Sequence, residues 1–429
     1  MSASKGTPVT YRTSNRCWVV LVSCFICTMI GFAIPVVAFG VFMAPIMEDL
    51  HSTAGEITMF MTMLTFGAIP AMVFGSKALE RFGAGKVQAV ASLLVGGGMI
   101  LVAVLQNVPM VLLAGFMSGL GYPLLAVFGA PIIVSNWFYK RRSTMIGVAL
   151  AAQGVGGMVS APIFSALIEL LGWQQALMAA GGSLALPLLL SIFVMRLSPL
   201  PYGILPYGAT VEDVEQGRVD AADDGSPAGV LPGLTLRQAS RTLPFALIVI
   251  VMLLSGFQAC YNNQTNLVMQ TAGYSPTVAG LIMSVMGFAG AVGNPACGYM
   301  VDKLGVAKTS NILFAMLGVG LIGFAATIYV HSIPLLVVSA FVASVGSVTG
   351  IALPSLYAQH TFGMKDYSTI YGAILAVRNF STAITATLCG TSYDVLGSYG
   401  PVVIMWAATA FVAIPLALIA VRRGPKLWE

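Results

Sequence analysis

Long apolar stretches alternate with short polar ones along the whole chain. Each apolar stretch is long enough for a helix to cross the hydrocarbon core of a bilayer, which takes about 20 residues. Six precede the polar stretch 196–242 and six follow it, so the pattern predicts an all-α membrane protein with twelve transmembrane helices in two pseudo-symmetric six-helix bundles. In chain order the apolar stretches are Cys17–Met43, Ile57–Phe74, Val87–Leu105, Val108–Phe138, Thr144–Leu171, Trp173–Met195, Leu243–Gln270, Thr277–Met300, Thr309–Val330, Ile333–Tyr357, Tyr367–Leu388 and Gly400–Val421.

The polar stretches divide the chain into five parts. We expect a tail at 1–16, a first bundle at 17–195, a linker at 196–242, a second bundle at 243–421 and a tail at 422–429. The middle of the linker holds acidic residues among Gly, Pro and Ser, a composition typical of a solvated tether. Its last part, Leu234–Ser240, is predicted to form a short helix at the membrane interface.

The composition agrees with a membrane protein and excludes other classes. Hydrophobic residues make up 58% of the chain and charged residues 8%, and the mean hydropathy of +0.90 lies far from that of soluble domains. The six cysteines lie in or beside apolar stretches without the spacing of metal ligands, so we expect no disulfide framework and no metal site. We find no ATP-binding fingerprint and no nucleophile–base pair, and we expect no enzyme, no cofactor and no nucleic-acid partner.

Lysine and arginine are distributed unevenly between the two predicted sides. With the N-terminus inside, nineteen of the twenty fall in the tails, the linker and the inner loops, and the predicted outer loops hold none. This is the positive-inside pattern. It predicts a multi-pass protein of the cell (inner) membrane with both termini in the cytoplasm. The twentieth cation, Arg378, lies within an apolar stretch.

A short charged motif follows the second helix of each predicted bundle. It reads E-R-F-G-A-G-K at 80–86 and D-K-L-G-V-A-K at 302–308, and two matching copies indicate a duplicated six-helix unit. Glycine permits a tight turn, and a charged residue at a helix end can bond to a neighbouring helix end. We therefore expect the two motifs to form a gate on the inner side. The simpler interpretation is that each motif is only a charged end to its helix, but that explains the similarity of the two copies poorly. The gate residues are Glu80, Arg81, Gly83, Lys86, Asp302, Lys303, Gly305 and Lys308.

Arg378 carries the strongest chemical signal in the membrane. Charged residues flank its stretch at similar distances on both sides, which places the guanidinium near the bilayer centre. On a helical wheel Ser381 and Thr385 fall on its side, whereas Phe380 and Ile384 fall on the opposite, lipid-facing side. An unpaired charge at that depth costs at least about 3 kcal/mol. We expect a small anionic substrate to supply the pairing charge.

The twelve predicted helices, the long central loop and the duplicated motif resemble the major facilitator superfamily along the whole chain. The first motif departs from the usual pattern, because Ser76 stands at its opening glycine position and Glu80 replaces an aspartate. The resemblance implies a transporter that works by alternating access between two bundles.

Within that superfamily, the run 136–157 looks like the aromatic–basic loop and glycine-rich fifth helix of monocarboxylate transporters and oxalate:formate antiporters. In those families a cation on helix 11 follows a Tyr-Gly pair at the spacing seen here from Tyr371 to Arg378, so the resemblance implies that Arg378 holds a substrate carboxylate. The oxalate:formate group has a second arginine on helix 8, where Asn294 stands in this sequence. One cation instead of two favours a monoanion. Asn294 can donate hydrogen bonds to that anion, or it can mark a helix kink with Pro295; both interpretations stay open.

Further polar residues lie on helices 4 and 7. Gln258, Tyr261 and Asn262 share one helical face, which either lines the site or makes interhelical hydrogen bonds. The outer end of that helix is predicted to be an unwound gate. Tyr122 lies midway along helix 4, where its phenol can reach a bound anion, although a packing kink at Pro123 is the simpler account. The predicted substrate-binding residues are therefore Arg378, Asn294, Tyr122, Gln258, Tyr261 and Asn262.

The function follows from the isolated cation. No Asp, Glu, Lys or His is expected at mid-membrane, and a loaded carrier buries a neutral pair where an empty one buries an unpaired charge. We expect a monomeric secondary transporter of a small organic anion, a monocarboxylate, acting by anion exchange or anion-linked uptake, with its substrate and the lipid bilayer as partners. Two alternatives stay open. One is a drug or metabolite efflux carrier, although the fifth helix lacks the Gly-Pro-x-x-Gly-Gly pattern of that class; the other is a transporter-fold nutrient sensor.

Overall fold

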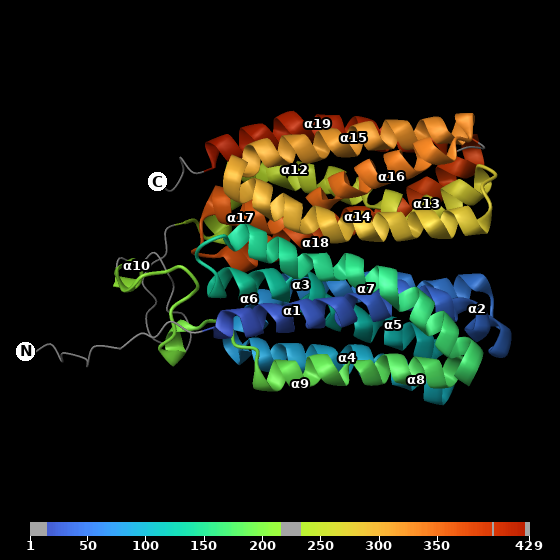
Figure 1. Ribbon diagram of the computed structural model, residues 1–429, viewed down its shortest axis with the longest axis horizontal. Helices are drawn as coiled ribbons and strands as arrows, with labels where there is room; N and C mark the ends of the chain where they lie inside the picture. The colour runs from blue at the N-terminus through green and yellow to red at the C-terminus, as the bar shows by residue number, and fades with distance from the viewer. Residues whose placement is uncertain (1–14, 216–232, 397–398, 425–429) are drawn as a thin grey trace, which may run out of the picture.

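The structure, a computed structural model, describes residues 15–215, 233–396 and 399–424. These residues are almost entirely helical, with isolated bridges in place of strands. Figure 1 shows the helices of the first half, blue to green, and those of the second half, yellow to red, as two bundles side by side. The predicted all-α fold is confirmed.

The first bundle contains six membrane crossings, three of which are assembled from shorter pieces. Two pieces are π-helical turns, η1 and η2, each next to a proline or containing one. In chain order the pieces are α1 (Arg16–Phe32), η1 (Ala33–Ala38) and α2 (Phe39–Asp49); α3 (Ala54–Phe82); α4 (Ala84–Leu105); α5 (Val108–Tyr122), η2 (Pro123–Val127) and α6 (Gly129–Trp137); α7 (Arg142–Leu171); and α8 (Trp173–Ser183) with α9 (Ala185–Phe193).

The second bundle repeats this plan, with breaks in its first and fourth crossings. The break in the fourth crossing is a single 3-10 turn, η4. The pieces are α12 (Leu243–Gln258) and α13 (Cys260–Thr271); α14 (Pro276–Leu304); α15 (Val306–Val330); α16 (Ile333–Ser347), η4 (Val348–Gly350) and α17 (Leu353–Phe362); α18 (Tyr367–Leu396); and α19 (Gly400–Arg423).

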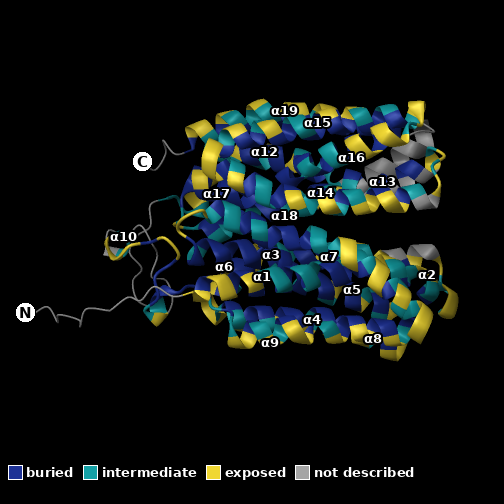
Figure 2. Cartoon of the chain, in the orientation of Figure 1, coloured by how far each residue is buried: buried dark blue, intermediate teal, exposed yellow. Residues whose placement is uncertain are grey.

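Length and composition suit a membrane. Ten helices among the described residues are long and apolar enough to cross one. The other two crossings are α12 with α13, of which α12 has only 16 residues, and α18, which carries Arg378. Figure 2 shows exposed residues on the outer surfaces of the bundles and buried ones between the helices. Because many exposed side chains are large and apolar, such as Phe66 and Phe193, the exterior suits lipid.

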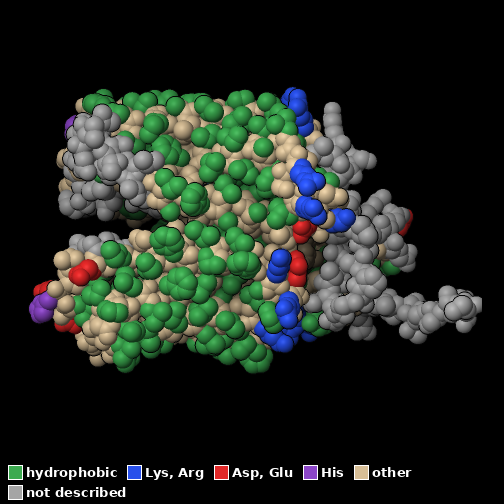
Figure 3. Space-filling view, turned by 180° about the vertical axis from the view of Figure 1, so that it is seen from behind, with side chains coloured by type: hydrophobic (Ala, Val, Ile, Leu, Met, Phe, Trp, Pro, Cys, Tyr) green, Lys and Arg blue, Asp and Glu red, His purple; other side chains and the backbone are tan. Residues whose placement is uncertain are grey.

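Charge is segregated along the molecule. Figure 3 shows the visible lysine and arginine side chains gathered at one end and histidine at the other. We call the first the basic end; Arg81, Lys140 and Lys303 belong to it, as do Arg16 at the start of α1 and Arg423 at the end of α19. The segregation agrees with the positive-inside pattern, and the side of the membrane that this end faces stays a prediction.

Small residues bring the two bundles into close contact. A methyl group added at Gly147 of α7 would overlap the Asn294 carbonyl of α14, and one added at Gly298 of α14 would overlap the Ser143 carbonyl of α7. The glycines of α7 therefore have the structural role of letting helices approach. This close approach, between α7 and α14, is a contact between the two bundles.

Both ends of the linker are attached to the basic end, which the sequence analysis missed. After η3 (Leu200–Tyr202), the Tyr207 amide donates to the carbonyl of Trp137, the last residue of α6, at 2.9 Å. At its other end, the Leu234 amide donates to the carbonyl of Phe362, the last residue of α17, at 2.8 Å. The linker thus joins corresponding helix ends of the two bundles.

The structure describes the predicted linker helix but only the beginning of the predicted acidic tether. A short helix, α11 (Leu236–Ala239), lies within the predicted range and begins with a Thr235 capping box. The predicted acidic tether begins in α10 (Val211–Glu215), and its remainder, from residue 216 to 232, lies outside the described residues.

Candidate functional site

Two broken helices open the interior of the second bundle. The helix of α12 ends at Gln258 and restarts one residue later as α13. The 3-10 turn η4 interrupts the fourth crossing at Val348–Gly350. Breaks of this kind are tolerated in a membrane where they line a cavity. Both breaks lie on the wall of the cavity that contains Arg378.

Close packing between α12 and α18 fixes the position of Arg378 along the axis of the second bundle. A methyl group added at Gly256 would overlap the Arg378 carbonyl. Ser381 donates to the Leu253 carbonyl at 2.6 Å, and Thr382 donates to the Gly256 carbonyl at 3.1 Å. The polar face of α18 is therefore bonded to the backbone of α12 on either side of the arginine.

The predicted orientation of α18 is confirmed. Ser381 and Thr385, expected on the inner face, are 9% and 1% exposed, whereas Phe380 and Ile384, expected to face lipid, are 56% and 47% exposed. The helical wheel succeeded because α18 runs unbroken through this region.

Arg378 is half-buried, and its Nε atom is buried without a hydrogen-bond partner. Among the described residues no carboxylate forms an ion pair with it. Its plane lies against η4: a methyl group added at Gly350 would come within 2.7 Å of Nε and 2.8 Å of Nη2. Only a glycine leaves room for the guanidinium there, so Gly350 and Arg378 fit as a pair.

Polar side chains line the cavity beside the guanidinium. The cavity has a volume of about 10 Å³, and its described lining comes wholly from the second bundle. Apart from Arg378 it contains hydroxyl and amide groups but no carboxylate or imidazole. The lining residues are Ser255, Gln258, Ala259, Asn262, Leu317, Ser347, Thr349 and Arg378.

Two further lining groups are buried and lack partners: the Gln258 Oε1 atom and the Thr349 hydroxyl. The hydrogen-bond network fixes the orientation of the glutamine amide. Thr409 donates its proton to the Trp406 carbonyl at 2.7 Å, so it accepts from Gln258 Nε2 at 3.2 Å. The cavity therefore offers one cation, one hydroxyl and one amide acceptor, all unpartnered. Buried groups of this kind are unfavourable until a ligand satisfies them.

The face predicted on helix 7 is divided by the structure. Gln258 and Asn262 line the cavity, but Tyr261 does not. Its hydroxyl donates to the Ala340 carbonyl at 3.3 Å, and its ring packs edge-on against Phe324. The predicted unwound outer segment is also absent, because α13 is helical from Cys260 to Thr271. Gln258 and Asn262, on either side of Ala259, keep the helical spacing i, i+4 on the cavity face, whereas Tyr261 falls at the edge of that face and packs against α15 and α16.

Asn294 lies away from the cavity lining. Its amide donates to the Gly290 carbonyl of its own helix at 2.9 Å, at the crossing of α14 with α7. The helix continues unbroken through Pro295. The amide thus bonds a backbone carbonyl one turn back, which agrees with the structural interpretation more than with substrate binding.

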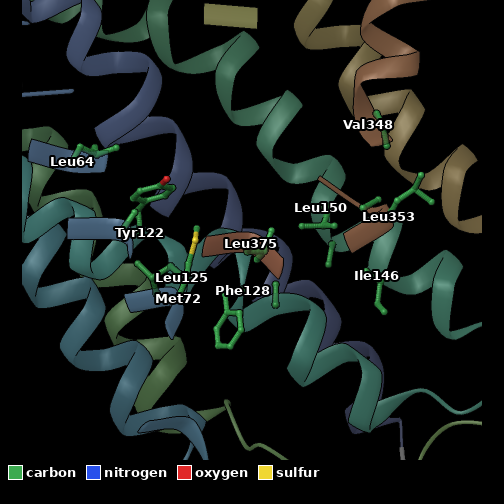
Figure 4. Packing of buried hydrophobic residues seen from close by; sticks show 14 of the residues in the cluster. Leu64, Met72, Tyr122, Leu125, Phe128, Ile146, Leu150, Val348, Leu353 and Leu375 are labelled. Atoms are coloured by element: carbon green, nitrogen blue, oxygen red, sulfur yellow. The ribbon is translucent and has the colours of Figure 1, made fainter. Parts of the chain in front are cut away.

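Tyr122 lies close enough to Arg378 to interact with it electrostatically. It is the last residue of α5, where the helix gives way to the π-helical turn η2 at Pro123, so the predicted kink is real. Figure 4 shows Tyr122 within the buried cluster that also contains Leu64 and Met72. Among the predicted substrate-binding residues, Tyr122 is the one that belongs to the first bundle.

The turn η2 has an unusual pattern of hydrogen bonds. Its carbonyls at positions 124, 125, 126 and 127 each accept a side-chain hydrogen bond from a different helix. The donors, in the same order, are Gln88 of α4, Thr28 of α1, Gln153 of α7 and Tyr371 of α18, at 3.3, 3.4, 3.0 and 2.8 Å. Only Tyr371 belongs to the second bundle. Its ring also stacks on Phe128, with the ring centroids 5.4 Å apart.

Residues that the sequence analysis missed include Ser255, Ser347, Thr349 and Gly350. The available signal was the polar run from Ser347 to Gly350 inside an apolar stretch, followed by Pro354. Such a run with glycine and proline is typical of an interrupted membrane helix.

The two charged motifs meet partner helices across the bundle interface. Glu80 accepts a hydrogen bond from Ser368 at the start of α18, at 2.6 Å. Asp302 accepts from the amide and the hydroxyl of Thr144 at the start of α7, at 2.9 and 2.5 Å. Each acid thus bonds the first turn of a helix in the other bundle, as the motif chemistry predicts.

The turn glycines of the two motifs also match. Gly83 and Gly305 both have φ of 80°, a left-handed conformation that favours glycine. The two copies are therefore alike in backbone as well as in bonding. Their role as a gate stays a proposal.

Removing the acid of either motif should slow transport and leave substrate affinity unchanged within a few-fold. In Asp302→Asn and Glu80→Gln the closed basic end loses a charge-assisted bond, but the cavity is untouched. Flux and binding measured on the same preparations separate the two effects. Glu56→Gln, which alters an acid in a capping box at the opposite end, is the matched control. Loss of binding in Asp302→Asn would show that the site extends to the basic end.

Two bundles of apolar helices, with an arginine facing a polar cavity inside one of them, are typical of a membrane transporter. The chain belongs to the Major Facilitator Superfamily, whose profile matches residues 20–386 and 246–428. It is 26% identical to monocarboxylate transporter 3 of Gallus gallus over 95% of this chain and 79% of that protein. It is 23% identical to monocarboxylate transporter 1 of Bos taurus, over 93% and 84%.

A solved structure shares the fold. The chain is similar to a proton:xylose symporter bound to 6-bromo-6-deoxy-D-glucose, with a TM-score of 0.74, 16% sequence identity, and coverage of 97% of this chain and all of that one. At that identity the likeness establishes the architecture alone. The chain is therefore a multi-pass membrane transporter, as the sequence predicted.

Proposed function

We propose that this protein is a secondary transporter of a small monocarboxylate, with Arg378 as the group that holds the carboxylate. The observation that carries the proposal is the Arg378 guanidinium on the wall of a polar cavity, with a buried Nε atom that has no partner. A carboxylate is the anion whose two oxygens match the guanidinium fork. The monocarboxylate transporters among the relatives support the same substrate class.

The remaining unpartnered groups suggest the shape of the substrate. Thr349 can donate to the carboxylate, whereas the Gln258 Oε1 atom can only accept. A carboxylic acid that also carries a hydroxyl would satisfy all three groups. We infer that hydroxy acids bind more tightly than the unsubstituted acids of the same length, because those leave the Gln258 oxygen unpaired.

The structure corresponds to a carrier closed at its basic end, which we place in the cytoplasm. Among the described residues, the hydrogen bonds between the bundles lie near the level of Arg378 or nearer the basic end. They join Glu80 to Ser368, Asp302 to Thr144 and Val127 to Tyr371, and two further ones to sulfur join Met72 to Asn379 and Arg142 to Met364. Separating these contacts while the far ends of the bundles approach would give alternating access.

We expect exchange of anions to drive transport more strongly than a proton gradient. No described lining residue is an acid or a histidine, and closing an empty site buries an unpaired arginine. Purified protein in liposomes should take up radiolabelled lactate rapidly when unlabelled lactate is inside, and slowly into empty vesicles at any pH gradient. Protein-free liposomes are the control for leakage. Strong accumulation in empty vesicles driven by a pH gradient alone would contradict the exchange mechanism.

A further inference from the structure

A hydroxyl outside the cavity determines which way the Gln258 amide faces. Thr409 of α19 gives its proton to the Trp406 carbonyl at 2.7 Å, and its oxygen accepts from Gln258 Nε2 at 3.2 Å. Because a hydroxyl has a single proton, a reversed amide would place the Gln258 oxygen against a lone pair of Thr409, where no hydrogen bond can form. Thr409 therefore holds the amide by its nitrogen and leaves the Oε1 atom without a partner.

The second amide of the cavity is held in the same way. Ser347 of α16 gives its proton to the Ser344 carbonyl at 2.8 Å, and its oxygen accepts from Asn262 Nδ2 at the longer distance of 3.5 Å. In both cases the hydroxyl has already donated to the carbonyl three residues earlier on its own helix, so it can only accept from the amide. Each amide thus turns its oxygen away from the hydroxyl that holds it.

The orientation of the Gln258 amide bears on the atom next to the substrate carboxylate. The buried Gln258 oxygen can only accept a hydrogen bond. A 2-hydroxy acid has a donor beside its carboxylate, whereas the 2-oxo acid of the same carbon skeleton has a carbonyl oxygen there. The two acids have the same charge and nearly the same size. A site built to bond a hydroxyl rejects an analogue that lacks it, because a buried group is then left unpaired.

Thr409 affects this choice without contacting the substrate. It is half-buried and does not belong to the described lining of the cavity, whereas its partner Gln258 does. The helices that carry the two residues, α19 and α12, pack against each other. The hydrogen bond to Gln258 is therefore the printed contact that links Thr409 to the cavity.

We propose that Thr409 is a positioning residue that makes the carrier select 2-hydroxy acids over 2-oxo acids, because it holds the Gln258 amide with its oxygen free to accept. The inference rests on the proposed function and specifies which group beside the carboxylate the site recognises. The wild type should therefore bind lactate more tightly than pyruvate.

The change Thr409→Val tests the proposal, because valine keeps the shape of threonine but cannot accept a hydrogen bond. The Gln258 amide can then reverse and present its nitrogen, a donor that suits a carbonyl. The half-saturating concentration should rise for lactate and fall for pyruvate, and the ratio of the two should change by about tenfold. Both are measured in liposomes by competition with radiolabelled lactate exchange. Thr409→Ser keeps the hydroxyl and should keep the wild-type ratio.

Opposite changes for the two acids separate positioning from structural damage, which would weaken both alike. The inference would be overturned if Thr409→Val weakened both acids by the same factor or left both unchanged. A wild type that bound pyruvate as tightly as lactate would overturn it as well. A wild type that exchanges no carboxylate would instead contradict the proposed function.

A double variant shows whether Thr409 acts through the amide. Gln258→Met replaces the amide by an apolar side chain of similar length, so it should lose the preference between the two acids. Adding Thr409→Val to Gln258→Met should then change the ratio no further, since the two residues act as one unit. A further change as large as that in Thr409→Val alone would contradict the proposal. The rises in melting temperature that lactate and pyruvate induce in the purified variants compare the two affinities without transport.

Discussion

Replacing Arg378 by alanine should abolish carboxylate transport without destabilising the empty protein. Arg378 is half-buried and forms no ion pair among the described residues, and its Nε atom is buried without a partner. Losing its contact with a carboxylate costs at least about tenfold in affinity. Removing an unpaired buried charge should leave the melting temperature of the purified protein unchanged or higher. Flux in liposomes and melting temperature with and without lactate are the two measurements.

Two companion variants make this result specific. Arg378→Lys keeps the charge but loses the planar fork, so it should bind lactate weakly and retain a small ligand-induced rise in melting temperature. Phe380→Ala changes a lipid-facing side chain on the same helix, 56% exposed, and should transport normally. If Arg378→Ala lowered the melting temperature and kept the lactate-induced shift, the arginine would be a structural residue.

The change Gly350→Ala should lower substrate affinity by at least about tenfold. The added methyl group would lie 2.7 Å from Arg378 Nε and 2.8 Å from the Ser255 hydroxyl, so the guanidinium must move away from the cavity. A displaced fork cannot keep two parallel hydrogen bonds to a carboxylate. Equilibrium binding of lactate to the purified variant measures the effect directly.

The matched control for this variant is Gly290→Ala in α14. A methyl group there would meet no atom within 4 Å, so this variant makes the same chemical change without a steric conflict. Binding that is normal in Gly290→Ala and weak in Gly350→Ala would assign the loss to the guanidinium. Normal binding in both would mean that Arg378 does not need its observed position to hold the anion.

The sequence was sufficient for the fold because a membrane imposes strong rules on it. Apolar length predicts the crossings, and charge in the loops predicts which ends lie together. The duplicated motif even predicted contacts, since an acid beside a glycine turn has few partners other than a neighbouring helix end. Glu80 and Asp302 confirm this expectation.

The site was harder to predict because it depends on interruptions that leave a weak signal. Arg378 is conspicuous as the one cation within an apolar stretch, and Gln258 and Asn262 were found by spacing along helix 7. Thr349 and Gly350 were missed, since a short turn in an apolar stretch does not alter the hydrophobic pattern. Tyr261 was placed in the site because it lies near Gln258 and Asn262 on the wheel, but it stands at the edge of their face and bonds to α16 instead.

The π-helical turn η2 also has a consequence for the direction of side chains. A π turn holds about one residue more than an α turn, and each residue advances an α-helix by about 100°. The extra residue therefore rotates α6 relative to α5, so the fourth crossing can present Tyr122 toward the cation and Ser135 toward the Tyr367 hydroxyl. An uninterrupted helix could not set these two directions independently. The turn therefore sets the rotation of α6 relative to α5. Four side-chain hydrogen bonds from four other helices hold the turn in place.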